Sequence, residues 1–364
     1  MTQRKTVLCI FGTRPETIKM VPVIRALQSS NWARCIVVVT AQHRDMLDQM
    51  LTRFGVAVDY DLNLMQPGQS PDQVLARMLP ELAEIIQQEN PYAVLAQGDT
   101  ATVFGAALAA FHGRVPFGHI EAGLRTHKLD HPFPEEGYRQ MVSRISRWHF
   151  APTAGAANAL RQEGIAESAI HLVGNTCIDT LLQTVAQAGT TAPSADRLIL
   201  LTAHRRENFG QPLQAVFHAV LQLLEQYPDV RVLYPVHPNP HVYELAHSMF
   251  GEHPRVQLVP PLDYFDFVAA MQSAHIILTD SGGVQEEAPA LGKPVLVLRQ
   301  TTERPEPVAE GVAELVGTDT AHIVQAVSRL LDDAQHYRSM ARVCMPYGDG
   351  MAAQQIVNTL KENT

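Results

Sequence analysis

The sequence predicts an α/β protein with two domains, each built on a doubly wound parallel sheet. Short apolar runs alternate with helical patterns along the 364 residues. These runs are apolar throughout, which is typical of strands in a parallel sheet that helices cover on both faces. The same alternation starts again after residue 174, so we expect two similar domains with a cleft between them, faced by the carboxyl ends of the strands.

The first domain is expected over residues 1–174 and contains four pairs of a strand and a helix. Gly12 allows the sharp turn after the first strand, and Pro15 suits the first turn of the following helix, where its missing N–H has no partner to lose. The expected order is strand 6–11, helix 15–27, strand 35–40, helix 45–54, strand 93–96, helix 102–112, strand 117–120 and helix 134–145.

The second domain is expected over residues 175–346, with a loop at 188–196, rich in Ala, Gly, Thr and Pro, before its first strand. Its expected strands are 198–201, 231–235, 256–258, 276–279 and 295–298, and its expected helices are 213–226, 264–272 and 284–291. A turn signal at 346–350 precedes a last helix at 351–361. We expect the segment 347–364 to pack back on the first domain.

Composition excludes several classes of protein. The net charge is −9, so the basic surplus of a nucleic-acid-binding protein is missing. No apolar stretch approaches the roughly 20 residues of a membrane span, and the run 7–11 is too short for a signal peptide. The four cysteines are scattered, with no C-x-x-C pair and no metal-binding motif. We therefore expect a cytoplasmic protein with no membrane insertion, no metal and no redox cofactor.

Two turns are candidates for binding an anion. After the first strand, Gly12 opens a helix whose N–H groups and dipole favour an anion, and Arg14 and Lys19 add cations. The turn is not a G-x-G-x-x-G sequence, which argues against NAD or FAD. A solvated loop is the alternative interpretation. After strand 276–279, the sequence Ser281-Gly282-Gly283 opens a second helix.

Ser281, Gly282 and Gly283 have small side chains or none, which leaves their backbone accessible, as a pyrophosphate requires. Glu287 lies where a carboxylate can accept hydrogen bonds from ribose hydroxyls. The alternative is a tight turn in which glycine is needed only for its conformation. Arg304 follows the strand 295–298 and adds a cation on the same side of the sheet.

Three carboxylates follow strands or open a helix in the first domain, namely Asp99, Glu121 and Glu135. Helix capping and first-turn charge are the alternative explanations for Asp99 and Glu135. In the second domain His204 follows the first strand and is a candidate for proton transfer or phosphate contact. A lone histidine is more often structural, but two arginines follow this one directly.

The motifs at 11–16, 40–44, 98–100, 119–126, 203–208 and 280–289 together resemble those of the non-hydrolysing UDP-N-acetylglucosamine 2-epimerases. The resemblance runs in order from about residue 6 to about residue 360. It implies the GT-B fold of glycosyltransferases, in which two Rossmann-like domains close on a UDP-sugar. It also implies a homodimer and an enzyme without a cofactor.

The resemblance implies roles for individual residues. Asp99, Glu121, Glu135 and His204 would be the catalytic set. The substrate-binding set would be Arg14, Lys19, Phe267, Ser281, Gly282, Gly283, Glu287 and Arg304, with Phe267 near the uracil. UDP-N-acetylglucosamine can also activate members of this family, and Gln42 and His43 match that allosteric region.

Two positions depart from the family pattern. Tyr138 stands where the family usually has Asn, and Gln97 stands where many members have His. The first departure raises the alternative that the substrate is a modified UDP-N-acetylhexosamine.

The chemistry expected is elimination of UDP to a 2-acetamidoglucal, followed by re-addition with a proton on the other face. Carbon 2 is not adjacent to a carbonyl carbon, so its hydrogen becomes acidic only as UDP leaves carbon 1. A GT-B glycosyltransferase, a hydrolysing epimerase and a non-catalytic nucleotide-sugar sensor are the alternatives. The three carboxylates favour epimerisation, because one group must accept a proton and another must supply one.

Overall fold

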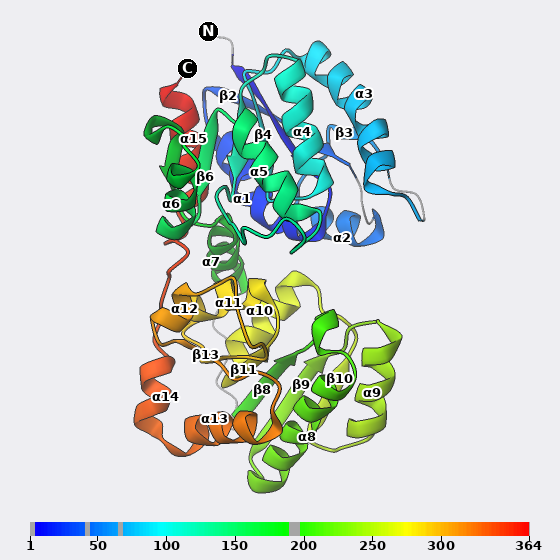
Figure 1. Cartoon of the computed structure of the whole chain (residues 1–364), viewed down its shortest axis with the longest axis vertical. Helices are drawn as coiled ribbons and strands as arrows, with labels where there is room; N and C mark the ends of the chain where they lie inside the picture. Colours follow the sequence, from blue (N-terminus) through cyan, green and yellow to red (C-terminus); the bar gives the residue numbers. More distant parts are fainter. Residues whose placement is uncertain (1–3, 41–43, 65–67, 189–196, 364) are drawn as a thin grey trace. The chain divides into compact units, whose positions relative to one another are not determined.

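The computed structural model describes residues 4–40, 44–64, 68–188 and 197–363. Their contacts group the chain into two compact units. Unit 1 consists of Met1–Thr180 together with Tyr347–Thr364, and unit 2 consists of Leu181–Pro346. Each unit contains one parallel sheet flanked by helices (Figure 1), so the predicted α/β fold with two doubly wound parallel-sheet domains is confirmed.

The sheet of unit 1 has seven parallel strands in the order β3-β2-β1-β4-β5-β6-β7. The order reverses beside β1, which pairs with both β2 and β4, so the carboxyl ends of β1 and β4 flank the point of reversal. The strands are β1 (Lys5–Phe11), β2 (Ala33–Val39), β3 (Tyr60–Asp61), β4 (Ala93–Gln97), β5 (Phe117–Ile120), β6 (Trp148–Ala151) and β7 (Ile170–Leu172).

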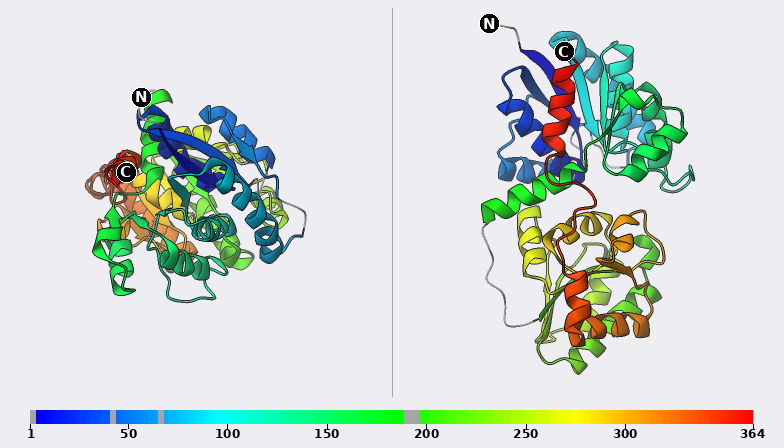
Figure 2. Two further views of the ribbon diagram at one scale, coloured as in Figure 1. Left: turned by 90° about the horizontal axis from the view of Figure 1, so that it is seen from above. Right: turned by 90° about the vertical axis from the view of Figure 1, so that its left-hand side faces the viewer.

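Helices cover both faces of this sheet because alternate strand residues point to opposite sides. On one face Cys9 packs in a cluster with Ile24 and Ile356, and on the other face Ile10 packs with Met78. The helices are α1 (Arg14–Ser29), α2 (Arg44–Phe54), α3 (Pro71–Glu89), α4 (Ala101–His112), α5 (Glu135–Ile145), α6 (Ala154–Gln162) and α15 (Ala352–Glu362). Helix α7 (Thr176–Ala188) begins in unit 1 and continues into unit 2 after Thr180. The last helix, α15, packs beside α1 (Figure 2).

The sheet of unit 2 has six parallel strands in the order β10-β9-β8-β11-β12-β13. They are β8 (Arg197–Thr202), β9 (Val230–Pro235), β10 (Val256–Val259), β11 (Ile276–Thr279), β12 (Val295–Val297) and β13 (Ala313–Leu315). The helices are α8 (Gln211–Gln226), α9 (Pro240–Phe250), α10 (Tyr264–Ser273), α11 (Gly282–Glu287), α12 (Glu306–Ala309), α13 (Thr320–Asp332) and α14 (Ala334–Met340). Leu201 of β8 lies in the core with Phe217 of α8 and Val327 of α13.

The helix predicted at 284–291 is wrong in its second half. The α-helical part α11 ends at Glu287, and a 3-10 turn over Ala288–Leu291 follows. Pro289 has no N–H to donate to the carbonyl four residues earlier, and Gly292 then ends the turn in the left-handed conformation at φ 67°. The other predicted strands and helices are present with limits that differ by a few residues.

Several elements are absent from the sequence-based assignment, including α3, α6, α7, α9 and α13. Helix α3 begins with a capping box in which Ser70 and Gln73 exchange hydrogen bonds with each other's backbone N–H groups. Pro80 lies inside this helix and interrupts the helical pattern of the sequence, which makes the helix harder to predict. Among the residues that the structure describes, no helix has the length and apolar character needed to cross a bilayer.

Candidate active site

Glu121 lies directly after β5 and is held by three hydrogen-bond donors. Its carboxylate accepts from Lys19 of α1 and from the amide of Gln97 at the end of β4. A third bond comes from Asn175 Nδ2, 2.8 Å from Glu121 Oε1. Glu121 has a φ of 65°, a left-handed conformation that a residue with a side chain rarely adopts. Such backbone strain is typical of a functional position, where the surroundings fix the side chain.

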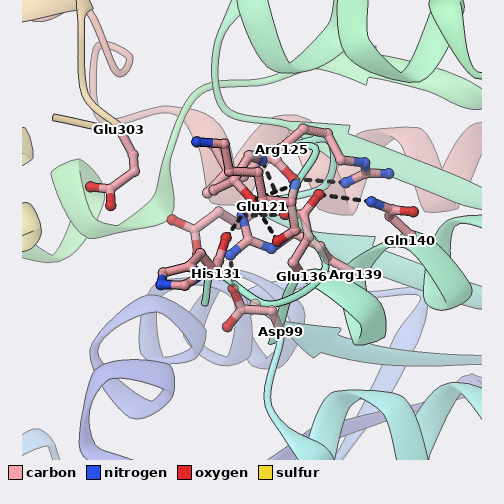
Figure 3. Close-up of polar contacts among 12 residues, drawn as sticks. Asp99, Glu121, Arg125, His131, Glu136, Arg139, Gln140 and Glu303 are labelled. Carbon is pink, nitrogen blue, oxygen red and sulfur yellow. Dashed lines mark hydrogen bonds and ion pairs between the residues drawn. The ribbon is translucent and has the colours of Figure 1, made fainter. Parts of the chain in front are cut away.

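Asp99 follows β4 and lies beside this group (Figure 3). Its Oδ2 forms an ion pair with Arg139 Nη2 at 3.0 Å. Burial raises the pKa of Asp99, and the negative charges of Glu121 and Glu135 raise it further, while Arg139 and Lys19 oppose the shift. Asp99 therefore holds a proton more readily than an ordinary aspartate does. The structure thus brings Asp99, Glu121 and Glu135 into electrostatic reach of one another.

The two neighbouring glutamates of α5 have different surroundings. Glu136 is fully buried and accepts bonds from the backbone N–H groups of Thr126 and His127 at 3.0 and 3.1 Å. It also accepts from Gln140 at 2.8 Å (Figure 3). Glu136 therefore fixes the chain that precedes α5. Glu135 is half-buried at the first position of α5. Of these two glutamates, Glu135 is the one whose charge raises the pKa of Asp99.

His119 supports the turn that leads into Asp99. Its ring is buried on β5, and its Nε2 lies 2.7 Å from the carbonyl oxygen of Gly98. Burial lowers the pKa of His119 to about 3, so the ring is neutral and must carry its proton on Nε2 to donate to that carbonyl. Gly98 has a φ of 92°, which glycine adopts without strain.

In the turn before α1, we expected backbone N–H groups that are exposed and able to bind an anion, but the structure shows two of them bonded within the chain. The carboxylate of Glu16 accepts the N–H groups of Gly12 and Thr13 at 2.7 and 2.8 Å. Thr13 and Glu16 form a capping box, so these two donors are already used within the chain. Arg14 is half-buried at the first position of the helix, and Lys19 points to Glu121.

Gly12 has a steric role as well. A Cβ atom added there would lie 2.0 Å from the hydroxyl oxygen of Thr40, so no larger residue fits without movement.

In unit 2, His204 and Asp280 form a pair at the ends of neighbouring strands β8 and β11. Asp280 Oδ2 accepts the backbone N–H groups of His204 and Arg205, each at 2.8 Å. Asp280 Oδ1 lies 3.3 Å from Nδ1 of His204. Burial lowers the pKa of His204, and the charge of Asp280 opposes that shift. The ring of His204 also stacks on that of His237, with centroids 5.7 Å apart.

The remaining predicted residues of unit 2 cluster around α11. Ser281 precedes the helix, and a Cβ atom at Gly282 would come within 3.1 Å of Arg304 Cζ, so glycine permits this close approach. Arg304 Nε donates to Glu286 Oε1 at 2.9 Å. Glu287 is buried and accepts from the hydroxyl of Tyr264 at 2.7 Å.

Gly283 is exposed in the first turn of α11, and Phe267 is half-buried on the neighbouring helix α10. The predicted allosteric residues Gln42 and His43 lie outside the described residues.

Tyr138, the departure from the family pattern, is a packing residue between α4 and α5. Its ring stacks on Phe104 with centroids 5.0 Å apart and an interplanar angle of 10°. Its side chain is buried, and burial raises the pKa of its hydroxyl. The aromatic ring of Tyr138, which Asn would lack, therefore serves the packing of α5 on α4.

We did not predict Asn175, Arg139 or Asp280 as site residues from the sequence, and we noted Gln97 only because it departs from the family pattern. Asp280 directly precedes Ser281 in the motif at 280–289, so its position in the sequence could have identified it as a site residue. Asn175 gave no such signal, because it follows Glu121 by 54 residues and reaches it only in the folded chain.

Comparison with known proteins gives one consistent result. A family model described as UDP-N-acetylglucosamine 2-epimerase matches residues 25–361. A protein of that name from Escherichia coli K12 is 45% identical over 370 aligned positions, which cover 98% of each chain. Another of that name, from Bacillus subtilis strain 168, is 47% identical over 359 positions and covers 97% of this chain and 94% of the relative.

A solved structure shows the same likeness in three dimensions. The crystal structure of UDP-GlcNAc 2-epimerase from Neisseria meningitidis bound to UDP-GlcNAc has a TM-score of 0.91 with this chain. The two sequences are 44% identical, and the match covers 98% of this chain and 100% of the other. The likeness in sequence and in fold therefore extends over both units.

Proposed function

The chain belongs to the UDP-N-acetylglucosamine 2-epimerase family, and we propose that it interconverts UDP-N-acetylglucosamine and UDP-N-acetylmannosamine. The observation that carries this function is the group of carboxylates at the ends of β4 and β5. Glu121 accepts bonds from Lys19 and two amides, whereas burial raises the pKa of the neighbouring Asp99. Inversion at carbon 2 needs two groups in different protonation states, because one accepts a proton and the other supplies one.

The reaction proceeds by elimination and re-addition. The bond between carbon 1 and the diphosphate oxygen breaks, and the proton on carbon 2 passes to a carboxylate, which leaves UDP and a 2-acetamidoglucal. The diphosphate oxygen then re-forms its bond to carbon 1 while carbon 2 takes a proton on its opposite face. No hydride moves and no electrons are gained or lost, so the reaction needs no redox partner.

Asp99 and Glu121 are the proton-carrying pair in this proposal. Glu121 takes part as an acceptor, since all three of its partners present N–H groups to it. Asp99 is the group that supplies a proton, because its raised pKa lets it hold a proton more readily than an ordinary aspartate does. Glu135 adds negative charge beside Asp99, and Lys19 and Arg14 stabilise charge that develops on the leaving diphosphate.

Unit 2 supplies recognition of UDP in this proposal, and the UDP-GlcNAc bound to the Neisseria meningitidis relative supports it. Gly282 and Gly283 leave the backbone at the start of α11 open to a diphosphate, beside the guanidinium of Arg304. Glu287, oriented by Tyr264, takes ribose hydroxyls, and Phe267 lies against the uracil. Ser281 assists at the diphosphate, and His204 completes the catalytic set as a neutral imidazole held by Asp280.

Three further properties belong to the same proposal. The protein acts in the cytoplasm, as a homodimer, and supplies a ManNAc-type sugar for cell-surface polysaccharide. A second molecule of UDP-N-acetylglucosamine acts as an activator near Gln42 and His43. Sedimentation at several protein concentrations tests the dimer. A trace of UDP-N-acetylglucosamine should increase the rate at which UDP-N-acetylmannosamine is converted, and an unchanged rate would reject the activator.

Incubation with UDP-N-acetylglucosamine in D2O tests the reaction itself. We expect deuterium at carbon 2 in a mixture of the two epimers. Glu121→Gln should reduce this exchange by roughly 10²- to 10⁴-fold, because it removes the acceptor. Glu167→Gln is the matched control, since Glu167 pairs with Arg161 on the exposed surface of unit 1. The absence of both exchange and epimer would reject the proposed substrate, and exchange only with a modified UDP-N-acetylhexosamine would favour that alternative.

A further inference from the structure

The chain passes between the two units twice, and the two passages lie side by side in unit 1. The first leaves unit 1 after Thr180, and the second returns at Tyr347. We call residues 174–180 and 347–353 the crossing pair. The backbone N–H of Asn175 donates to the carbonyl oxygen of Tyr347 at 2.6 Å. Asp179 Oδ1 accepts the N–H of Ala353 at 2.8 Å.

Two glycines allow this close approach. A Cβ atom added at Gly174 would lie 3.0 Å from Gly348 Cα and from the carbonyl oxygen of Tyr347. The reciprocal atom at Gly348 would lie 3.0 Å from Gly174 Cα. Both glycines have positive φ, 92° and 115°, so both the space and the conformation favour glycine. The backbones of the crossing pair are therefore in direct contact, with no side chain between them.

Asn175 connects this contact to Glu121. Its side chain is buried, and its Nδ2 donates to Glu121 Oε1 at 2.8 Å. Its Oδ1 accepts the N–H of Cys177 at 3.1 Å and so caps the start of α7. One residue thus bonds through its backbone to the returning passage, through its oxygen to the departing helix, and through its amide N–H to the carboxylate that we place in the reaction.

We propose that Asn175 is a positioning residue that holds Glu121 in place and ties it to the crossing pair, an inference that rests on the proposed function. Any change in the course of the chain at Tyr347 acts on Asn175 through a hydrogen bond of 2.6 Å. The amide then passes that displacement to Glu121, whose strained backbone at φ 65° depends on its partners. The orientation of the acceptor is thereby coupled to where the chain leaves and re-enters unit 1.

Substitution of Asn175 distinguishes this role from simple helix capping. Asp caps a helix as well as Asn does, so a capping role predicts that Asn175→Asp behaves like the wild type and that Asn175→Ala is the worse variant. The positioning role predicts the opposite order, because Asp places a second acceptor against Glu121. We expect kcat to fall about 10-fold in Asn175→Ala and about 100-fold in Asn175→Asp, with KM within a few-fold of the wild type.

The pH dependence gives a second readout. Two carboxylates at hydrogen-bond distance share one proton more readily than either does alone. Lowering the pH should therefore restore part of the activity of Asn175→Asp but none of that of Asn175→Ala. Asn158→Asp is the matched control, because Asn158 is exposed on α6 and its oxygen already accepts from Arg161 at 2.6 Å.

The second passage supplies an independent variant in case Asn175 variants fold poorly. Gly348→Ala should push Tyr347 away from Asn175 and lower kcat about 10-fold, an effect of the size of one charged hydrogen bond. Gly164→Ala also places a side chain at a positive φ, 81°, but meets no atom within 4 Å, so its kcat should stay unchanged.

Four results decide the inference. Wild-type kcat in Asn175→Asp, or equal losses in Gly348→Ala and Gly164→Ala, would overturn it while the proposed function stands. A wild-type enzyme that shows no exchange at carbon 2 would overturn both. A loss of kcat in the order Asp below Ala, with rescue of Asp at low pH, supports it.

Discussion

At the scale of the residue, the cation of Arg139 limits how far the pKa of Asp99 is raised. Arg139 Nη2 lies 3.0 Å from Asp99 Oδ2 and lowers the pKa of Asp99, against the larger effect of burial and the charges of Glu121 and Glu135. The net direction is a raised pKa. Arg139 thus moderates a shift that burial alone would make larger.

We predict that Arg139→Gln moves the Asp99 limb of the pH–rate profile to higher pH by roughly 1–2 units, because it removes the cation that lowers this pKa. The limb is identified first as the one that disappears in Asp99→Asn. Profiles of kcat/KM for the wild type and both variants make the measurement. A limb that stays in place or moves to lower pH would show that Arg139 does not act on Asp99.

A second prediction at this scale concerns Tyr138. Tyr138→Asn, which restores the residue usual in the family, should lower the free energy of unfolding by about 2–3 kcal/mol, because a buried ring stacked on Phe104 is lost. Activity on UDP-N-acetylglucosamine should stay within a few-fold. A double-mutant cycle with Phe104→Leu should give a coupling of about 0.5–1.5 kcal/mol. Unchanged stability with a new sugar preference would instead place Tyr138 in the sugar subsite.

At the scale of the element, α7 and α15 are joined by one buried carboxyl. Asp179 of α7 accepts the N–H of Ala353 in the first turn of α15 at 2.8 Å, while its Oδ2 is buried with no hydrogen-bond partner among the described residues. Burial raises the pKa of Asp179 from 3.8 to about 6, and the N–H groups of Ala353 and Ala352 oppose this shift only in part. Near pH 5 the folded chain therefore binds a proton that the unfolded chain has lost.

The stabilisation from this proton is full at low pH and is lost as the pH rises through about 6. Asp179→Asn keeps an acceptor for Ala353 and does not ionise. We predict that it raises the free energy of unfolding at pH 7.5 by about 1–2 kcal/mol and changes it much less at pH 5. Urea unfolding at the two pH values measures this. An equal effect at both would contradict the assigned titration.

At the scale of the whole molecule, the last helix belongs to unit 1, the same unit as the first strand of the chain. Helix α15 buries Ala353, Ile356, Val357 and Leu360 in the cluster that contains residues of β1 and α1. Unit 1 is therefore complete only when the chain has passed through unit 2 and returned.

Two neighbouring positions on α15 test this dependence. Ile356→Asp places a charge at a fully buried position and should cost unit 1 at least about 4 kcal/mol, a large part of the stability of a domain. Gln355→Asp changes an exposed position one residue earlier and should stay within about 0.5 kcal/mol. Thermal unfolding followed by circular dichroism compares them. Similar melting temperatures would mean that α15 adds little to unit 1.

The sequence by itself determined the fold class and the family. Apolar runs without alternation can be buried only in a sheet covered on both faces, so they specified parallel strands and the places where those strands end. The positions of Asp99, Glu121 and Ser281 followed, because each lies within two residues of the end of a strand.

Only the tertiary structure decided which partners these residues have. Lys19, Gln97 and Asn175 meet at Glu121 from three separate elements, although 156 residues separate the first from the last. The N–H groups of Gly12 and Thr13, which looked open to an anion, are used by Glu16. The physical reason is that hydrogen bonds and pKa shifts depend on distances and burial, and packing sets these between segments whose spacing in the chain carries no record of their contact.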